Sequence, residues 1–223
     1  MKTIKIIRMS LHPDEFSAAD IPRLRGFLAG YFPQYKEIHN HLANGGFRLV
    51  YPELQFKFIE GKPCIVGFAS GFKIITEIFN HLGFIEISHR KIYLHEKSVQ
   101  IKEEFIGESK EYLSYRFETP WMALNQKNYK TFIESNLYDR EQKLNRILWG
   151  NLRALAHAFN YWIEDQDTLK VNGHFKMHKS NFKGNTMLTF KGEFITNFFI
   201  PDFLGLGKQV ARGFGTVKKI KEI

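Results

Sequence analysis

Two histidines lie two residues apart in the stretch "EIHNHLANGG", at positions 39 and 41, just before a pair of glycines. Histidine titrates near neutral pH, so two neighbouring imidazoles can divide the roles of general base and general acid between them. Such a pair suits a reaction in which an attacking hydroxyl loses a proton and a leaving oxygen gains one. Nearby cations would stabilise the negative charge that develops in between. His39 and His41 are therefore candidate catalytic residues.

The spacing of the pair restricts where it can lie. Side chains two residues apart on a regular helix point about 200° away from each other, whereas on a strand or in an irregular loop they can face one site. We therefore expect the pair at the frayed end of the first helix or in the loop after it. Two alternatives remain, a zinc half-site for which the sequence offers no obvious further ligands nearby, and two surface histidines without a role.

Four glycines surround two cations near the C-terminus, in the stretch "GLGKQVARGFGTVKKI": Gly205, Gly207, Lys208, Arg212, Gly213 and Gly215. Glycine lets the backbone approach a ligand closely, so this segment is a candidate phosphate cradle. Its spacing differs from the dinucleotide-binding fingerprint, and it lacks the Gly-Lys-Ser/Thr ending of a P-loop. A nucleotide cofactor is therefore disfavoured. The alternative is a structural turn packed against a sheet.

The charge of the chain favours a polyanionic partner. The formal net charge is +9 and the isoelectric point is about 9.5. From residue 170 to the end, ten Lys or Arg residues face three acidic ones, a balance of +7 around the glycine-rich segment. This is where an electrostatic footprint for nucleic acid would be expected. Arg146 lies on a basic stripe of a long predicted helix, which is either a ridge that faces RNA or an ordinary solvated surface.

The elements that must position these residues begin with a strand over residues 2–11 and a helix over 21–32, with Asp20 as its cap. A hairpin within 47–68 turns at "IEGKP", a helix covers 72–83, and a strand covers 84–95. The order strand, helix, strand, strand, helix, strand is that of a ferredoxin-like fold.

The pattern begins again after a polar stretch over residues 96–111. It predicts a strand over 112–120, a short helix near 125–135, a long helix over 140–159, and a strand pair within 187–201 that turns near Lys191 and Gly192. We therefore predict an α+β chain of two tandem ferredoxin-like (RRM-like) folds. The first domain, residues 1–105, carries the histidine pair, and the second, residues 106–223, carries the glycine-rich loop.

The composition is that of a well-filled globular protein, with 43% hydrophobic and 15% aromatic residues among 223. A single cysteine, Cys64, excludes an internal disulfide, and its apolar surroundings in the sequence predict an inert core thiol. The sequence predicts a cytoplasmic protein without a signal peptide or a membrane span. Trp121 with Asn125 and Gln126 is either a base-stacking group or part of the core.

Four stretches together carry a family resemblance: "IHNHLANGGFRLVYPELQFK", "YRFETPWMALNQKNY", "KLNRILWGNLRAL" and "IPDFLGLGKQVARGFGTVKKI". The last resembles the C-terminal signature of the repeat-associated RNA-binding superfamily. The chain resembles in particular the CRISPR-associated endoribonucleases of the Cas6 family, in its b-type branch. These enzymes cut precursor CRISPR RNA within its repeats. The resemblance covers nearly the whole chain.

The resemblance implies two tandem ferredoxin-like folds that bind repeat RNA and cleave it without metal or cofactor, leaving 5′-hydroxyl and 2′,3′-cyclic phosphate ends. It transfers the catalytic role to His41 and His39, with His41 preferred, and adds Tyr31 and Lys57 as auxiliary candidates beside Tyr35 and Tyr51. RNA binding is assigned to the glycine-rich segment, Arg146 and Arg48. Leu49 and Val50 stand where the branch often has aromatic and basic residues, so the auxiliary charge is not fixed by the resemblance.

The partners that this interpretation predicts are repeat RNA and precursor CRISPR RNA, and it leaves room for other Cas effector proteins and for a second copy of the chain. Two competing functions remain at this point. One is a non-catalytic RNA-binding subunit of a CRISPR effector complex, which would bind RNA tightly without cleaving it. The other is a ferredoxin-like protein-interaction module, which would not bind repeat RNA.

Overall fold

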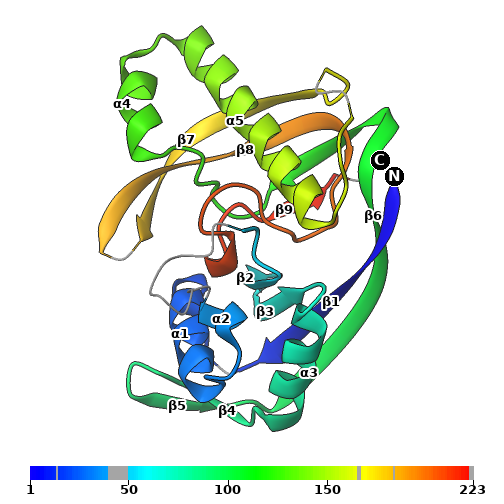
Figure 1. Ribbon diagram of the computed structural model, residues 1–223. Coiled ribbons are helices and arrows are strands. Elements are labelled where there is room, and N and C mark those ends of the chain that lie inside the picture. Colours follow the sequence, from blue (N-terminus) through cyan, green and yellow to red (C-terminus); the bar gives the residue numbers. More distant parts are fainter. Residues whose placement is uncertain (14, 40–49, 165–166, 183, 221–223) are drawn as a thin grey trace. The chain divides into compact units, whose positions relative to one another are not determined.

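The computed structural model describes residues 1–13, 15–39, 50–164, 167–182 and 184–220 (Figure 1). The chain divides into two compact units. The N-terminal unit comprises Lys5–Glu104 together with Val210–Gly213, and the C-terminal unit comprises Met1–Ile4, Phe105–Gln209 and Phe214–Ile223. A short piece of the glycine-rich segment thus belongs to the N-terminal unit.

The N-terminal unit contains the predicted succession of strands and helices. Its elements are β1 (Lys2–His12), the 3₁₀ helix η1 (Ala18–Asp20), α1 (Ile21–Tyr31), α2 (Lys36–His39), β2 (Leu54–Ile59), β3 (Lys62–Gly67), α3 (Gly71–His81), β4 (Phe84–Ile87), β5 (Arg90–Tyr93), the first part of β6 (Glu96–Phe117) and the 3₁₀ helix η2 (Val210–Arg212). α1 begins after Asp20, as predicted, and has Pro22 in its first turn. The predicted capping role of Asp20 is wrong, because its carboxylate accepts from the amide and the hydroxyl of Ser17 and makes no cap hydrogen bond to α1. The predicted turn of the first hairpin is confirmed, because β2 and β3 pair on either side of Glu60 and Gly61.

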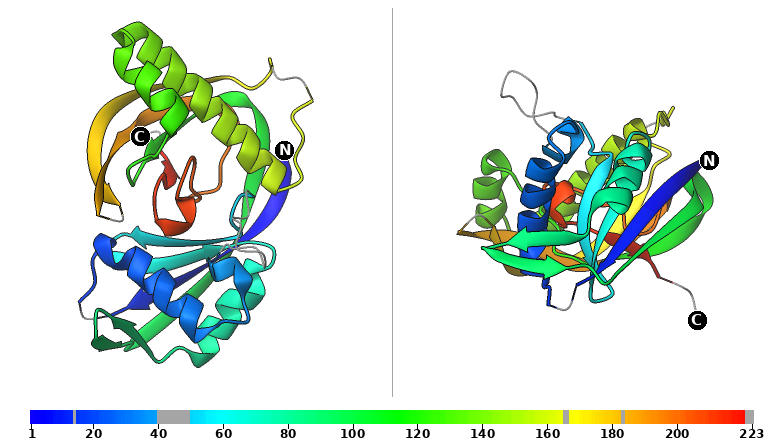
Figure 2. Two further views of the ribbon diagram at one scale, coloured as in Figure 1. Left: turned by 60° about the vertical axis from the view of Figure 1, so that its left-hand side comes forward. Right: turned by 90° about the horizontal axis from the view of Figure 1, so that it is seen from below.

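The sheet of this unit has the order β2, β3, β1, β6, which is the strand order of a ferredoxin-like fold. Both α1 and α3 cover one face of it (Figure 2). Their buried leucines and isoleucines pack against alternate residues of the strands, among them Met9, Phe56 and Ile65, none of which is exposed. Burial of this apolar face is the main force that holds the helices on the sheet.

Two further sequence predictions for this unit are wrong. Residues 84–95 form not one strand but a separate hairpin of β4 and β5, whose turn residues Ser88 and His89 have φ of 52° and 62°. Both values belong to a tight hairpin turn that usually carries Asn-Gly, so this pair gave no turn signal. The fourth strand of the sheet is instead β6, which begins in the stretch predicted to be a polar connection. It is an edge strand there and is largely exposed, so it lacks the alternating apolar pattern.

The C-terminal unit repeats the fold. Its elements are the second part of β6, α4 (Gln126–Glu134), α5 (Leu137–Ala158), β7 (Val171–Phe182), β8 (Asn185–Phe199) and β9 (Val217–Lys219). The strands have the order β9, β6, β8, β7, which is again that of a ferredoxin-like fold. α5 confirms the predicted long helix and lies across the sheet (Figure 1), with Leu144, Leu148, Leu152 and Leu155 all buried.

The predicted turn at Lys191 and Gly192 is wrong. β8 runs straight through these residues, which pair with Lys176 and Phe175 of β7. A Cβ atom on Gly192 would lie 2.0 Å from the carbonyl oxygen of His174, so glycine here allows two backbones to approach rather than a turn. β7 was missed because most of its side chains are exposed.

Within the described part of the chain, no helix combines the length and apolar character needed to cross a membrane.

Candidate functional site

The first histidine of the predicted pair, His39, lies at the end of α2. His39 is the last residue of this short helix, which follows α1 directly and is anchored by the fully buried Ile38. The amide of Ile38 donates to the carbonyl of Tyr35 at 3.2 Å and starts the helical turn. His41 and Arg48 lie outside the described residues, so their predicted roles stay predictions.

Tyr31 ends α1 with its side chain 43% exposed. Its ring contacts those of Phe27, Phe32 and Phe84, with centroids 5.5, 5.0 and 6.0 Å away. These contacts fix an aromatic ring that is still accessible from outside. The geometry is compatible with an auxiliary role for its hydroxyl.

Lys57 lies on β2 opposite Cys64 of β3, and its side chain has no exposed area. Among the described residues, none forms a hydrogen bond with its ammonium nitrogen. Burial penalises the charged form and lowers the pKa of Lys57 to about 7. A lysine with this pKa can accept or donate a proton near neutral pH, which an ordinary surface lysine does not do.

The glycine-rich segment forms a tightly folded loop whose shape needs glycine. Gly215 has φ of 64°, and a Cβ atom there would lie 2.0 Å from the carbonyl oxygen of Leu206. The amide of Leu206 in turn donates to the carbonyl of Gly215 at 2.8 Å. Gly207, with φ of 90°, packs against the indole of Trp121. Two parts of the loop thus lie closer together than side chains would permit.

Several amides of this loop already donate to the protein. Those of Lys208, Gly213 and Gly215 bond to carbonyls of Met122, Val210 and Pro120 at 3.1, 3.3 and 2.9 Å. These amides are therefore not available as a phosphate cradle. The loop instead offers an anion the side chains of Lys208 and Arg212.

We expect Gly215→Ala to lower the free energy of unfolding by about 2 kcal/mol or more, because the residue has a left-handed conformation and no room for a Cβ atom. Chemical denaturation of the purified protein measures this. Gly150→Ala is the matched control, since Gly150 is in the helix α5 with nothing within 4 Å of the added carbon. Its expected effect is a gain of about 0.5–1 kcal/mol, and equal losses in both variants would contradict the assignment.

Arg212 lies in η2 beside a buried cation, Arg25 of α1. Arg25 is only 8% exposed. Burial, followed by the positive charge of Arg212, lowers the pKa of Arg25 to about 10. A guanidinium group stays protonated in proteins, so the two positive charges repel each other. A negatively charged ligand near Arg212 would relieve this repulsion.

Sequence reasoning missed Arg25, although a signal was present. Ile21, Leu24, Arg25 and Leu28 share one stripe of α1, and all four are buried. A charged residue on the apolar stripe of an amphipathic helix is unusual and calls for a partner. Its proximity to Arg212 depends on a contact between segments at opposite ends of the chain, which no local pattern predicts.

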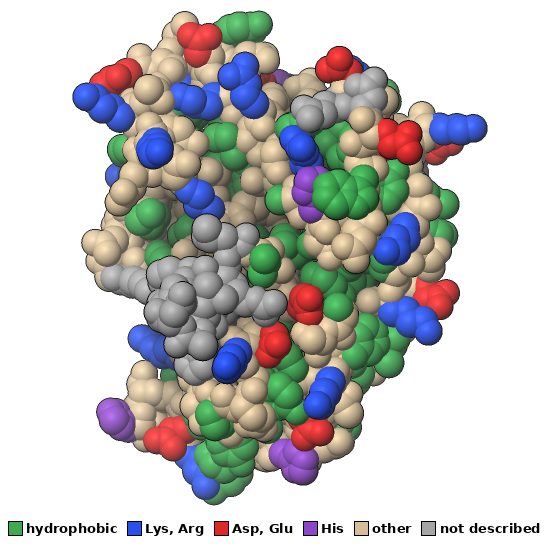
Figure 3. Space-filling model, viewed as in Figure 1, with side chains coloured by type: hydrophobic (Ala, Val, Ile, Leu, Met, Phe, Trp, Pro, Cys, Tyr) green, Lys and Arg blue, Asp and Glu red, His purple; other side chains and the backbone are tan. Residues whose placement is uncertain are grey.

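Arg146 is exposed on α5. Figure 3 shows several Lys and Arg side chains over α4 and the start of α5. The neighbouring Lys143 donates to the hydroxyl of Thr131 at 2.5 Å. The guanidinium of Arg153 lies 5.7 Å from the centroid of the Trp149 ring. These interactions suit a solvated helix surface, and the role of Arg146 in RNA binding stays a prediction.

Trp121 belongs to the core. Its side chain has no exposed area, its ring stacks on Phe117 with centroids 5.1 Å apart, and its Nε1 donates to Oδ1 of Asn151 at 3.1 Å. The base-stacking alternative for Trp121 is therefore wrong. The side chain of Asn125 is also occupied, because its oxygen accepts from the amide of Asn128 at 2.8 Å and caps α4.

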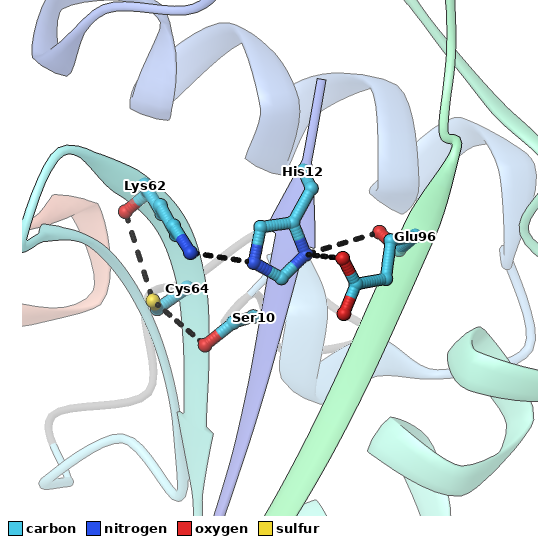
Figure 4. Close-up of polar contacts among 5 residues, drawn as sticks. All are labelled: Ser10, His12, Lys62, Cys64 and Glu96. Atoms are coloured by element: carbon cyan, nitrogen blue, oxygen red, sulfur yellow. Dashed lines mark hydrogen bonds and ion pairs between the residues drawn. The ribbon is translucent and has the colours of Figure 1, made fainter. Parts of the chain in front are cut away.

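A polar cluster that the sequence did not indicate joins strands β1, β3 and β6 (Figure 4). Nε2 of His12 lies 2.8 Å from Nζ of Lys62, and Nδ1 lies 3.3 Å from the carbonyl oxygen and 3.9 Å from the carboxylate of Glu96. An ammonium can only donate, so Nε2 accepts and Nδ1 carries the proton. The cluster thus joins side chains of three strands that meet only after folding.

Cys64 lies beside this cluster, with its sulfur 3.4 Å from the hydroxyl oxygen of Ser10 (Figure 4). Burial raises the pKa of the Cys64 thiol, which agrees with an inert core thiol. In the part of the chain that the structure covers, no three His, Cys, Asp or Glu side chains are grouped to hold a metal ion.

The two units, each with the strand order of a ferredoxin-like fold, define the class of tandem ferredoxin-like proteins. The sequence model of the Cas6b N-terminal domain matches residues 2–105, and that of the Cas6b C-terminal domain matches residues 107–220. The chain belongs to the Cas6b family.

Solved structures agree with this assignment. A crystal structure of Cas6b is 35% identical with a TM-score of 0.90, and covers 98% of this chain and 100% of its own. A crystal structure of the CRISPR RNA processing endoribonuclease Cas6b is 33% identical with a TM-score of 0.78, over the same shares of the two chains. The uncharacterized protein MJ0978 of Methanocaldococcus jannaschii is 35% identical over 124 residues, which are 55% of this chain and 83% of that protein.

Proposed function

We propose that this protein is a metal-independent endoribonuclease that binds CRISPR repeat RNA and cuts precursor CRISPR RNA within its repeats. The observation that carries the proposal is membership of the Cas6b family across both halves of the chain, together with the likeness to a Cas6b that processes CRISPR RNA. His39 at the end of α2 and the cations of the glycine-rich loop support it from this chain's own residues.

The proposed reaction is an internal transesterification. One imidazole of the pair removes the proton of a 2′-hydroxyl, whose oxygen attacks the adjacent phosphorus, and the bond to the 5′-oxygen breaks. The other imidazole protonates that 5′-oxygen as it leaves. The products are a 2′,3′-cyclic phosphate and a 5′-hydroxyl end. Tyr31 and Lys57 are auxiliary groups in this proposal, since one is an accessible hydroxyl and the other has a pKa of about 7.

RNA is held in this proposal by cations of the glycine-rich loop. Arg212, beside Arg25, is placed where a phosphate would offset the repulsion between two guanidinium groups. Lys208 adds a third positive charge from the same loop, and burial lowers its pKa. Gly205, Gly207, Gly213 and Gly215 shape the loop that presents these side chains.

The purified protein is expected to cleave its host's repeat RNA at one position in the presence of EDTA, because the acid–base mechanism uses no metal ion. The ends are read by labelling: a polynucleotide kinase should label the 5′-hydroxyl directly, and the cyclic phosphate should require acid opening before phosphatase acts. Cleavage that stops in EDTA, or that leaves a 5′-phosphate, would overturn the mechanism. Tight, salt-sensitive binding without cleavage under any condition would favour the alternative of a non-catalytic RNA-binding subunit.

Arg212→Gln should weaken binding of repeat RNA by about 10-fold or more, because a charge-assisted hydrogen bond to phosphate is lost. The slope of log affinity against log salt should also fall by about 0.7 for each phosphate contact removed. Denaturant unfolding of the same variant separates a loss of RNA contact from a loss of folding.

Arg23→Gln is the matched control for this prediction. Arg23 lies on the same unit, is exposed, and pairs with Asp20 at 2.9 Å. Its replacement should change the affinity less than about twofold, since exposed ion pairs contribute little. Equal losses of RNA affinity in the two variants would point to net charge rather than to a site at Arg212.

A further inference from the structure

A pocket in the C-terminal unit takes no part in the proposed cleavage reaction. Its volume is about 740 Å³, which is within the range of pockets that hold small ligands. Three segments line it: the start of α4 with the residues before it, the end of the β7–β8 hairpin at Phe182 and Thr186–Leu188, and Lys208 and Gln209 of the glycine-rich loop. Part of the proposed RNA-binding loop, Lys208 and Gln209, therefore also lines this pocket.

The walls of this pocket are fixed by hydrogen bonds of the backbone. The amide of Lys208 donates to the carbonyl of Met122 at 3.1 Å, and both residues line the pocket. At the start of α4, Asn125 and Asn128 cap each other through bonds of 2.8 and 2.6 Å. A pocket built this way is formed before a ligand arrives, which lowers the entropic cost of binding.

The lining suits a flat aromatic group joined to an anion. The Tyr129 ring is 49% exposed and Phe182 contributes a second ring, so apolar surface is available to stack on a base. Gln126 is exposed and offers both an amide donor and an acceptor to a base edge. Lys127 and Lys208 supply positive charge, and none of the described residues that line the pocket is acidic.

This chemistry selects RNA over other occupants. Single-stranded RNA is read by proteins that splay out an unpaired base, stack it on aromatic rings and bond its edge. An apolar peptide side chain would leave the two lysines without a binding partner. A lone phosphate would leave the aromatic rings without one. Trp121 and Asn125 are both occupied within the protein, so the side chains of Gln126 and Tyr129 are the main candidates to contact a base.

We propose that this pocket holds one unpaired nucleobase of the bound RNA and selects its identity through Gln126. The proposal rests on the proposed binding of repeat RNA and adds a specific subsite to it. One position of the repeat, rather than the whole strand, is then read at the pocket. Lys127 and Lys208 contact the phosphates on either side of that nucleotide.

The test is a cycle that combines protein variants with an abasic scan of the repeat RNA. Each nucleotide is replaced in turn by an abasic one, and affinity for the whole protein is measured at low salt. At one position the wild type should lose about 5- to 150-fold in affinity, the range for loss of one stacked base. Leu188→Trp, which fills the pocket, should lose a similar factor on intact RNA and nothing further on that abasic RNA.

A second variant and a control keep the test independent of folding. Gln126→Ala changes an exposed side chain, and it should reduce discrimination among the four bases at the same position and nowhere else. Ile195→Trp adds a similar ring on β8 at an exposed site outside the pocket, and it should leave the scan unchanged. Additive losses for Leu188→Trp and the abasic position would overturn the proposal.

Two further outcomes separate a failure of the base-binding subsite from a failure of the proposed RNA binding. If free uridine or adenosine monophosphate bound in the pocket but no RNA position coupled to Leu188, the site would serve a free nucleotide and the proposal would be wrong. If the wild type bound no repeat RNA at low salt, the proposed function itself would fail and this subsite with it. Intact binding of RNA without any coupled position would overturn only the subsite.

Discussion

Repeat RNA should be cleaved about 10²–10⁴-fold more slowly when His41 is replaced by alanine, because that is what one positioned general acid or base contributes. His39→Ala should have a comparable effect, and the double variant should lose little more, since residues that act as one unit are not additive. Single-turnover cleavage of end-labelled RNA measures the rate. Binding of RNA to the same variants should change less than about threefold, because the two imidazoles act on the reacting atoms.

His12→Ala is the informative comparison for the histidine pair. His12 lies in the same unit and its ring is held between Lys62 and Glu96, so it is the described histidine whose surroundings most resemble a catalytic group (Figure 4). Its replacement should leave cleavage unchanged. A protein that cleaves normally without His39 and His41, or that stops cleaving without His12, would show that the catalytic assignment is wrong.

Lys57→Met should raise the free energy of unfolding at pH 7 by a few kcal/mol, the second large effect expected. The native pKa of Lys57 is lowered by burial from 10.5 to about 7. In the unfolded chain the lysine is protonated up to pH 10.5, whereas in the native protein it is neutral above about pH 7. Unfolding thus takes up a proton between these values, and native stability should rise by about 1.4 kcal/mol per pH unit from pH 7 to 10. Below pH 7 both states are protonated and this dependence flattens.

Methionine removes this titration while it fills a similar volume. The difference in stability between Lys57→Met and the wild type should therefore shrink as the pH rises from 7 to 10, as measured by denaturant unfolding. Lys73→Met changes an exposed lysine on α3, and it should alter stability by less than about 0.5 kcal/mol at every pH. A difference for Lys57 that does not depend on pH would contradict a buried, neutral lysine.

The same Lys57 variant separates its structural cost from its auxiliary role. If Lys57 takes part in the reaction, cleavage by the more stable Lys57→Met protein should fall while RNA binding stays. Retained cleavage would leave Lys57 as a buried residue without a part in the chemistry. A loss of cleavage in this variant could not be caused by unfolding, because the variant is expected to be more stable than the wild type.

Much of the fold follows from the sequence because its signals are local. α1 and α3, the β2–β3 hairpin, α4 and α5 each carry an apolar periodicity or a turn that a single segment reveals. The wrong predictions share one cause. β7 and the first part of β6 are exposed strands, so their sequences carry no alternating apolar pattern. The turn at Ser88 and His89 lacks the Asn and Gly residues that usually mark such a turn in a sequence.

The sequence alone determined that this chain contains ferredoxin-like folds, an excess of positive charge near its C-terminus, a glycine-rich loop and a histidine pair. Only the tertiary structure decided that Arg212 meets Arg25, that Lys57 loses its contact with water, and that the loop's amides bond to the protein. The physical reason is that the apolar periodicity of a segment indicates only which of its faces is buried. Partners, pKa values and pockets depend on which distant segments are brought together.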